Sequence, residues 1–222
     1  MDIRSQLDAD TLAARHRQVR GHRSEALAIR LHRAISWLRG AEQMPPEHPD
    51  GRFIHLWIAF NAAYAGDVDF DENERSRVLR FIGRVVQADA GKQLHPLLFN
   101  QFPGPIRTLI GNRFVFEPFW RALREHDASD AWQRRFEASR QRAMAALLEG
   151  HTADVMAVVF DRLYVLRNQL VHGGATWNGN VNRQQVHDGC AILGALVPVM
   201  LDILIAAEGF DDDPVAYPVL PG

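Results

Sequence analysis

The sequence contains one cysteine, Cys190, and one lysine, Lys92, among 222 residues. A single cysteine cannot form an internal disulfide, and it excludes a zinc site built from several cysteines. Because Cys190 lies in an apolar run, we expect a buried and unreactive thiol. Almost all positive charge therefore comes from arginine, whose planar guanidinium is well suited to binding phosphate.

The sequence also lacks a strong charge of one sign and a long hydrophobic run. A net charge of -2 and a pI near 6.5 argue against a uniformly basic surface that would bind nucleic acid. These values are still compatible with a local basic groove. The longest apolar stretch, 190–201, contains Pro198 and ends before Asp202. It is short for a membrane span, and residues 1–12 lack the apolar core of a signal peptide. We expect a cytoplasmic protein with no membrane partner.

Alternating patterns typical of strands are rare, whereas apolar residues recur at spacings of three and four. Leu27, Leu31, Ile35 and Leu38 mark one such helix face, and Gly40 is expected near its end. The sequence predicts an all-α bundle of four or five long helices with short helical insertions.

The predicted organisation is one helical domain over 1–208, with an irregular insertion at about 91–128 and an acidic, proline-rich tail at 209–222. Asp71 and Glu74 are expected to cap one helix, and Ser129 another. These assignments leave the long helices around 155–172 and 183–207 as the framework for any site.

One long helix ends in VLRNQLVHGG, residues 165–174, where polar residues interrupt an apolar run. The Arg-x4-His spacing alone says little, because 24 arginines and 10 histidines predict about one such pair by chance and the chain has three. Arg17–His22 and Arg121–His126 lie in ordinary charged segments. Arg167–His172 is set apart by its apolar flanks, by Asn168, and by two glycines that allow the backbone to leave the helix.

Helix geometry separates the two members of this pair. Five residues at roughly 100° each place Arg167 and His172 about 140° apart, whereas Asn168 and His172 share a face. A single regular helix therefore cannot direct both Arg167 and His172 at one phosphate. Either the glycines unwind the helix end, or a second copy of the helix supplies the missing group. An ordinary helix end with polar capping residues is the alternative.

Other polar groups are weaker candidates. His187-Asp188 is compatible with a metal phosphohydrolase, but the further ligands such a site needs are missing, so a surface pair and no metal site are expected. Asn61 lies among aromatic core residues and is a secondary binding candidate. Arg134 and Arg135 belong to an arginine-rich helix that is either solvated or follows an RNA backbone.

The segment Arg167-Asn168-Gln169-Leu170-Val171-His172 resembles the defining motif of the HEPN superfamily: arginine, a polar residue, a few variable residues and histidine. A second segment resembles the pattern W-x-A-F-N-x-x-Y that occurs in several HEPN branches. The matching residues are Trp57, Ala59, Phe60, Asn61 and Tyr64. The resemblance covers roughly 50–66 and 150–207.

This resemblance implies a HEPN-like helical bundle that dimerises through its motif helices and acts as a metal-independent endoribonuclease of toxin or defence type. Arg167 and His172 would be catalytic, with Asn168 in support, and the 2′-hydroxyl of the RNA would attack the adjacent phosphorus. No cofactor is implied, and a cognate antitoxin or regulatory protein is a further partner. The alternative is a non-catalytic module that binds nucleotides, RNA or a protein.

Overall fold

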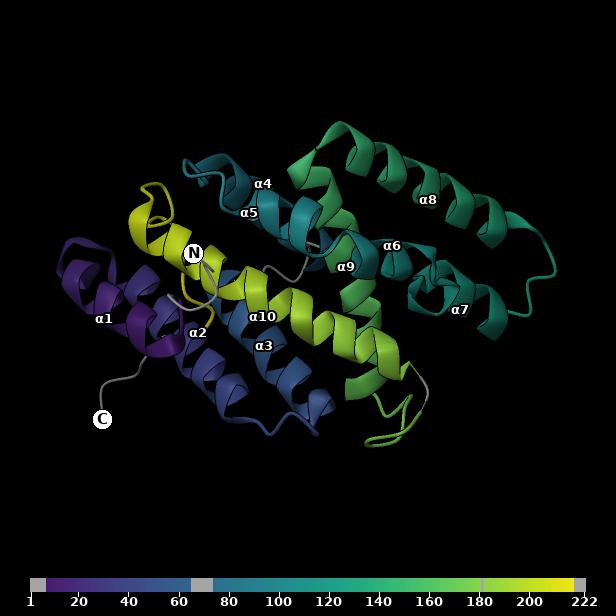
Figure 1. Ribbon diagram of the computed structural model, residues 1–222, viewed down its shortest axis with the longest axis horizontal. Helices are drawn as coiled ribbons and strands as arrows, with labels where there is room; N and C mark the ends of the chain where they lie inside the picture. The colour runs from purple at the N-terminus through teal and green to yellow at the C-terminus, as the bar shows by residue number, and fades with distance from the viewer. Residues whose placement is uncertain (1–6, 65–73, 181, 218–222) are drawn as a thin grey trace. The chain divides into compact units, whose positions relative to one another are not determined.

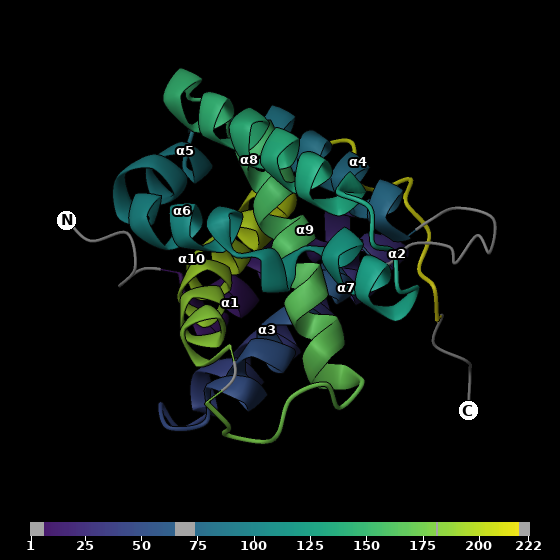
Figure 2. The same ribbon diagram turned by 90° about the vertical axis from the view of Figure 1, so that its right-hand side faces the viewer.

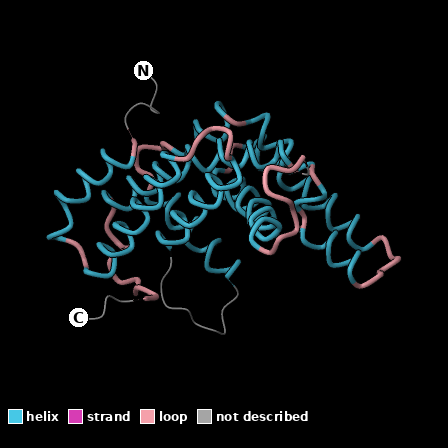
Figure 3. Tube along the Cα trace, turned by 90° about the horizontal axis from the view of Figure 1, so that it is seen from below, coloured by secondary structure: helices cyan, strands magenta, loops and turns pink. Residues whose placement is uncertain are grey.

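The computed structural model describes residues 7–64, 74–180 and 182–217 (Figure 1). Within these ranges the chain forms helices joined by loops and contains no strand (Figure 3), which confirms the all-α prediction. The α-helices are α1 Ala9–Val19, α2 Glu25–Gln43, α3 Pro49–Tyr64, α4 Glu74–Ala88, α5 Leu94–Pro96, α6 Pro103–Gly111, α7 Glu117–Arg124, α8 Ala131–Glu149, α9 Thr152–Val171 and α10 Arg183–Ala206. The expected Asp71–Glu74 capping pair lies outside the described residues.

The chain divides into two compact units, the first made of Met1–Gly91 with Cys190–Gly222 and the second of Lys92–Gly189. The sequence suggested one domain with an insertion at 91–128. In the structure this segment packs with the helices that follow it, because α6 contacts α8 and α9, and α7 contacts α8. The predicted insertion and the Arg-Asn-x3-His helix therefore belong to the same unit.

In the first unit, α2 packs on α3, and α1 packs on α2. Leu27, Leu31 and Leu38 are almost fully buried, as their spacing predicts. Helix α2 continues past Gly40 to Gln43. A Cβ on Gly40 would lie 2.8 Å from the His55 ring of α3, so this glycine permits close helix packing and does not end the helix.

The apolar C-terminal half of α10 belongs to the first unit. Cys190 is buried, as expected, and its thiol donates to the Pro49 carbonyl at 3.1 Å. By length and composition α10 is apolar enough to cross a membrane, but 72% of its most apolar stretch is buried inside the protein. Core helices of globular proteins show the same combination of hydropathy and burial.

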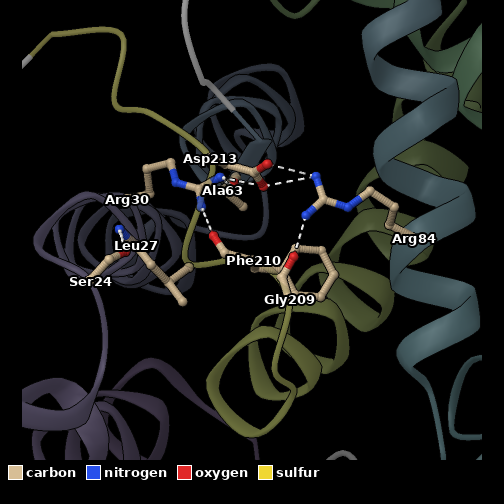
Figure 4. Close-up of polar contacts among 8 residues, drawn as sticks. All are labelled: Ser24, Leu27, Arg30, Ala63, Arg84, Gly209, Phe210 and Asp213. Atoms are coloured by element: carbon tan, nitrogen blue, oxygen red, sulfur yellow. Dashed lines mark hydrogen bonds and ion pairs between the residues drawn. The ribbon is translucent and has the colours of Figure 1, made fainter.

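The start of the C-terminal segment 209–217 is packed rather than extended as a free tail. Phe210 is 2% exposed, and Asp213 accepts hydrogen bonds from Arg84 at 2.7 and 2.9 Å. Asp213 also lies 3.5 Å from the buried Arg30 (Figure 4). Burial lowers the pKa of the Arg30 guanidinium, and the charge of Asp213 opposes this shift. Asp213 therefore balances the charge of the buried Arg30 and of the partly exposed Arg84.

In the second unit, α8 and α9 pack against each other (Figure 2). Helix α9 also contacts the 3₁₀ turn Arg113–Val115. The predicted cap of α8 is displaced by one residue: the N-cap position is Asp130, whose side chain makes no capping hydrogen bond, and Ser129 precedes it. The Ser129 hydroxyl accepts a hydrogen bond from the Ala131 N–H at 3.3 Å, in the turn that leads into the helix. Helix α8 ends at Gly150, which has a φ of 74°. The next helix, α9, carries the Arg-Asn-x3-His segment.

Candidate functional site

Helix α9 ends in a Schellman motif that the two glycines make possible. The Gly174 N–H donates to the Gln169 carbonyl at 2.7 Å, and the Gly173 N–H donates to the Leu170 carbonyl at 3.4 Å. Gly173 has a φ of 71°, in the left-handed region that favours glycine. The helix therefore stops immediately after His172, and the chain turns away without unwinding the preceding turn.

A pocket of about 730 Å³ lies against this helix end, wholly within the second unit. Its lining residues are Phe114, Glu117, Trp120, Arg124, Val165, Asn168, Gln169, His172, Gly174 and Asn182. Four of these residues come from α9 and its C-terminal cap: Val165, Asn168, Gln169 and His172. Their spacing of i, i+3, i+4 and i+7 places them on one face of the helix. Asn168 and His172 therefore face the same cavity.

Arg167 lies outside the pocket lining. Its guanidinium turns toward the neighbouring side chain, where Nη1 donates to Asn168 Oδ1 at 2.9 Å, and Cζ lies 5.9 Å from the centroid of the Tyr164 ring. The structure thus brings Asn168 and His172 together and attaches Arg167 to them through Asn168. This matches the angular separation expected for a regular helix.

A hydrogen-bonded network joins the two walls of the pocket. The Phe114 carbonyl accepts from Trp120 Nε1 at 2.8 Å and from Gln169 Nε2 at 2.6 Å. Asn182 Nδ2 then donates to Gln169 Oε1 at 2.6 Å. The aromatic wall is therefore fixed to the polar face of α9 by shared acceptors, which restricts the side chains to one arrangement.

Two charged side chains, Glu117 and Arg124, are among the residues that line the pocket. Glu117 is paired with Arg121 at 3.0 Å and with Arg124 at 3.6 Å, and all three side chains are at least 44% exposed. Arg113 lies over the Phe114 ring, with its Cζ 5.0 Å from the centroid. With three arginines against one glutamate, the segment 113–124 carries a local positive charge despite the acidic chain.

Arg162 supports the aromatic wall from inside the second unit. This side chain of α9 is fully buried, and its Cζ lies 4.5 Å from the Phe116 ring centroid and 5.7 Å from that of Phe136. Arg162 Nη2 also donates to the Ser139 hydroxyl at 3.1 Å. Since Phe116 follows Phe114 by two residues, this contact fixes the segment that forms the wall.

The secondary binding candidates lie apart from the pocket lining. Asn61 belongs to α3 in the first unit, and its Oδ1 is buried without a hydrogen-bond partner among the described residues. Arg134 and Arg135 are exposed on α8. None of these three side chains is among the residues that line the second unit's pocket.

The competing sequence motifs show no assembled site. Arg121 pairs with Glu117, and His126 lines a separate cavity of about 280 Å³. His187 is exposed, while Asp188 accepts a hydrogen bond from Gln184 at 2.9 Å. Among the residues the structure describes, no cluster of three or more His, Cys, Asp and Glu side chains could hold a metal ion.

Sequence reasoning missed the second wall of the pocket. Phe114 and Trp120 belong to the irregular segment at 91–128, and Asn182 lies in the loop before α10. The signal for the first two was the density of aromatic residues in RFVFEPFW, residues 113–120, where Phe114 is 40% exposed. An exposed aromatic residue that is held in place often marks a binding surface.

The arrangement combines a histidine, an amide attached to an arginine, and an aromatic wall around one cavity. Histidine transfers protons near neutral pH, and arginine stabilises charge on a phosphate. These groups suit proton transfer beside an anion more than hydride or redox chemistry. Comparison of the chain with protein-family models, curated proteins and solved structures finds no match.

Proposed function

We propose that the protein is a metal-independent endoribonuclease of the toxin or defence type that uses Arg167, Asn168 and His172. The observation that carries the proposal is that Asn168 and His172 line the same pocket, while Arg167 donates a hydrogen bond to Asn168 at 2.9 Å. The resemblance of this segment to the HEPN motif supports the same reading. The local excess of arginine in 113–124 suits a polyanionic substrate.

In the proposed reaction, neutral His172 takes the proton from a ribose 2′-hydroxyl, and this oxygen attacks the adjacent phosphorus. The bond from phosphorus to the 5′-oxygen breaks, and a protonated histidine gives that oxygen its proton. Arg167 stabilises the negative charge that develops on the phosphate oxygens. The products are a 2′,3′-cyclic phosphate and a 5′-hydroxyl, and the reaction consumes no water in this step.

Cleavage of RNA is expected to persist in excess EDTA, because the proton transfers and charge stabilisation come from side chains. The measurement is single-turnover cleavage of a labelled RNA, with the product ends identified by enzymatic end-labelling and mass spectrometry. We expect cyclic phosphate and 5′-hydroxyl ends. Cleavage that requires added Mg²⁺ or Mn²⁺ and leaves 5′-phosphates would falsify the mechanism.

We further propose that the active unit is a homodimer in which two motif helices face one RNA phosphate. Arg167 lies outside the pocket of its own helix, so a second copy related by twofold symmetry can complete the set of groups. The end of α9 also exposes apolar surface, since Val171 is 52% and Trp177 64% exposed. A second copy would cover this surface, and its His172 would supply the acid for the 5′-oxygen.

A mixed dimer tests the shared site. One subunit is wild type and the other carries Arg167→Ala with His172→Ala, and the two are purified through different tags. If each subunit cleaved independently, this dimer would keep about half of the wild-type rate, whereas a shared site predicts a far lower rate. The control is a mixed dimer with Arg17→Ala and His22→Ala in one subunit, expected near the wild-type rate, because both side chains are exposed in an ordinary charged segment. A half-active mixed dimer or a fully active monomer would rule out the shared site.

A further inference from the structure

The aromatic wall of the pocket is held by several contacts and is partly open to solvent. Phe114 is 40% exposed, and its ring centroid lies 6.4 Å from that of Trp120. The indole N–H of Trp120 is held by the Phe114 carbonyl at 2.8 Å, and Phe119 packs edge-on against the indole at 5.1 Å. The planes of the Phe114 and Trp120 rings are inclined at 47°, so each ring offers its own apolar face, and these contacts orient the faces for stacking of a planar ligand.

Facing this wall are side-chain amides that each carry donors and an acceptor. One amide hydrogen of Gln169 is donated to the Phe114 carbonyl, and one of Asn182 is donated to the Gln169 side-chain oxygen. The Asn168 carbonyl oxygen accepts from Arg167, which directs this amide as well. Positioned amides beside an aromatic face match the edge and face of a nucleobase, which presents ring donors and acceptors in one plane.

The dimensions and charge of the pocket agree with such a ligand. Its volume of about 730 Å³ lies within the roughly 300–1,000 Å³ typical of small-molecule sites. Arg124 and His172 both line this cavity. A base in the pocket would therefore place its attached sugar and phosphate near the groups proposed for catalysis, while Arg124 meets the anionic backbone.

We propose that this pocket binds one unstacked nucleobase of single-stranded RNA, next to the phosphate addressed by His172. The inference rests on the proposed function, which it deepens by defining the substrate as RNA whose bases are free to leave a stack. Trp120 and Phe114 provide the stacking surface, and the Gln169 amide orients the base edge. Bases within a duplex cannot enter, because stacking and pairing hold them in the helix.

Titration calorimetry of the full chain with mononucleotides tests recognition of the base. The probes are AMP, GMP, CMP and UMP, and ribose 5-phosphate is the control without a base. At least one nucleotide is expected to bind about tenfold more tightly than ribose 5-phosphate, as stacking predicts. The proposal is overturned if no nucleotide binds or if ribose 5-phosphate binds as tightly as all four.

Two tryptophans provide a matched pair of variants. Trp120 and Trp132 both pack edge-on against Phe119, with ring centroids at 5.1 and 5.0 Å, but only Trp120 lines the large pocket. Trp120→Ala is expected to weaken nucleotide binding about tenfold, and Trp120→Phe to restore most of it. Trp132→Ala is expected to leave the affinity unchanged. Equal losses in Trp120→Ala and Trp132→Ala would contradict the proposal.

A second measurement does not depend on the folding of an alanine variant. Each of the five tryptophans gives one indole N–H signal in a two-dimensional NMR spectrum of the wild-type chain. The spectra of Trp120→Phe and Trp132→Phe identify these two signals. Addition of the tightest-binding nucleotide is expected to shift the Trp120 signal and leave the Trp132 signal in place. An unshifted Trp120 signal would refute the base pocket.

The outcomes separate this inference from the proposed ribonuclease activity. Nucleotide binding that depends on Trp120, without RNA cleavage, would retain the base pocket and refute the nuclease. RNA cleavage with the same rate in wild type and Trp120→Ala, and without nucleotide binding, would retain the nuclease and refute the pocket. If both hold, cleavage of a single-stranded RNA should exceed that of the same sequence in a duplex.

Discussion

His172→Ala is expected to lower the rate of RNA cleavage by about 100-fold or more, because a general acid–base histidine contributes roughly 10²–10⁴-fold. Arg167→Ala should cause a loss of about the same size, since a donor aimed at developing negative charge contributes about 10²–10³-fold. Asn168→Ala should have a smaller effect, because Asn168 positions Arg167 and the pocket face without moving the proton. Single-turnover rates on one RNA measure all three variants.

The controls are the histidines of the two other Arg-x4-His pairs. His126→Ala and His22→Ala are expected to keep most of the activity, because His126 lines a separate cavity and His22 is exposed in the 3₁₀ turn Arg20–His22. Circular dichroism should show unchanged helix content in every variant. If His126→Ala were as damaging as His172→Ala with the fold intact, the site would be misplaced. Full activity in His172→Ala would exclude His172 from the chemistry.

The helices could be predicted because their signals are local. The three- and four-residue spacing of Leu27, Leu31 and Leu38 identifies a buried face whatever packs against it. The end of α9 could be predicted for the same reason, since Gly173 and Gly174 permit the left-handed turn that the structure shows. The angular relation between Asn168 and His172 follows from helix geometry alone, and both side chains do line one pocket.

The other wall of the pocket could not be predicted, because it depends on contacts between residues distant in the sequence. The hydrogen bond from Gln169 to the Phe114 carbonyl spans 55 positions. Segment 113–120 consists of the 3₁₀ turn Arg113–Val115 and the first turn of α7, which are too short for a sequence period to orient Phe114 and Trp120. Gly40 shows the same limitation in the first unit, since its role depends on the approach of His55 from the neighbouring helix.

Buried arginines were also hidden from sequence reasoning. An arginine in an amphipathic helix is expected at the surface, with its charge in water. Arg30 of α2 is nevertheless 1% exposed, and it donates to the Phe210 carbonyl at 2.7 Å and to the Ala63 carbonyl at 3.2 Å. Its position depends on acceptors from the C-terminal segment, about 180 residues later. The acidic composition near the C-terminus predicted a tail, but it did not predict that this segment packs against Arg30.

The environment of Arg30 places it among the most sensitive positions of the first unit. Asp213 lies 3.5 Å from Arg30 Nη1 and also accepts from Arg84, whose Nη2 donates to the Gly209 carbonyl at 2.5 Å (Figure 4). The guanidinium of Arg84 lies 4.7 Å from the Phe210 ring centroid. The two arginines thus hold residues 209–213 through backbone acceptors, one carboxylate and one aromatic ring.

Arg30→Ala is expected to lower the free energy of unfolding by about 3–5 kcal/mol, because it removes one partner of a buried charged network and leaves a cavity. The Ala63 and Phe210 carbonyls lose their donor, and Asp213 keeps only Arg84. Urea unfolding followed by circular dichroism measures the effect.

Arg39→Ala is the matched control on the same helix. Arg39 pairs with Asp10 at 2.8 Å, but the two side chains are 41% and 87% exposed, so the loss of this pair should change the free energy of unfolding by about 1 kcal/mol or less.

Asp213→Ala should lower the free energy of unfolding by an amount between those of Arg30→Ala and Arg39→Ala. Arg30 would keep its two carbonyl acceptors, while its charge would lose the nearest carboxylate. Because the network is shared, Arg30→Ala with Asp213→Ala should destabilise the protein by less than the sum of the single changes. Equal, small effects of Arg30→Ala and Arg39→Ala would show that the C-terminal segment contributes little to the stability of the first unit.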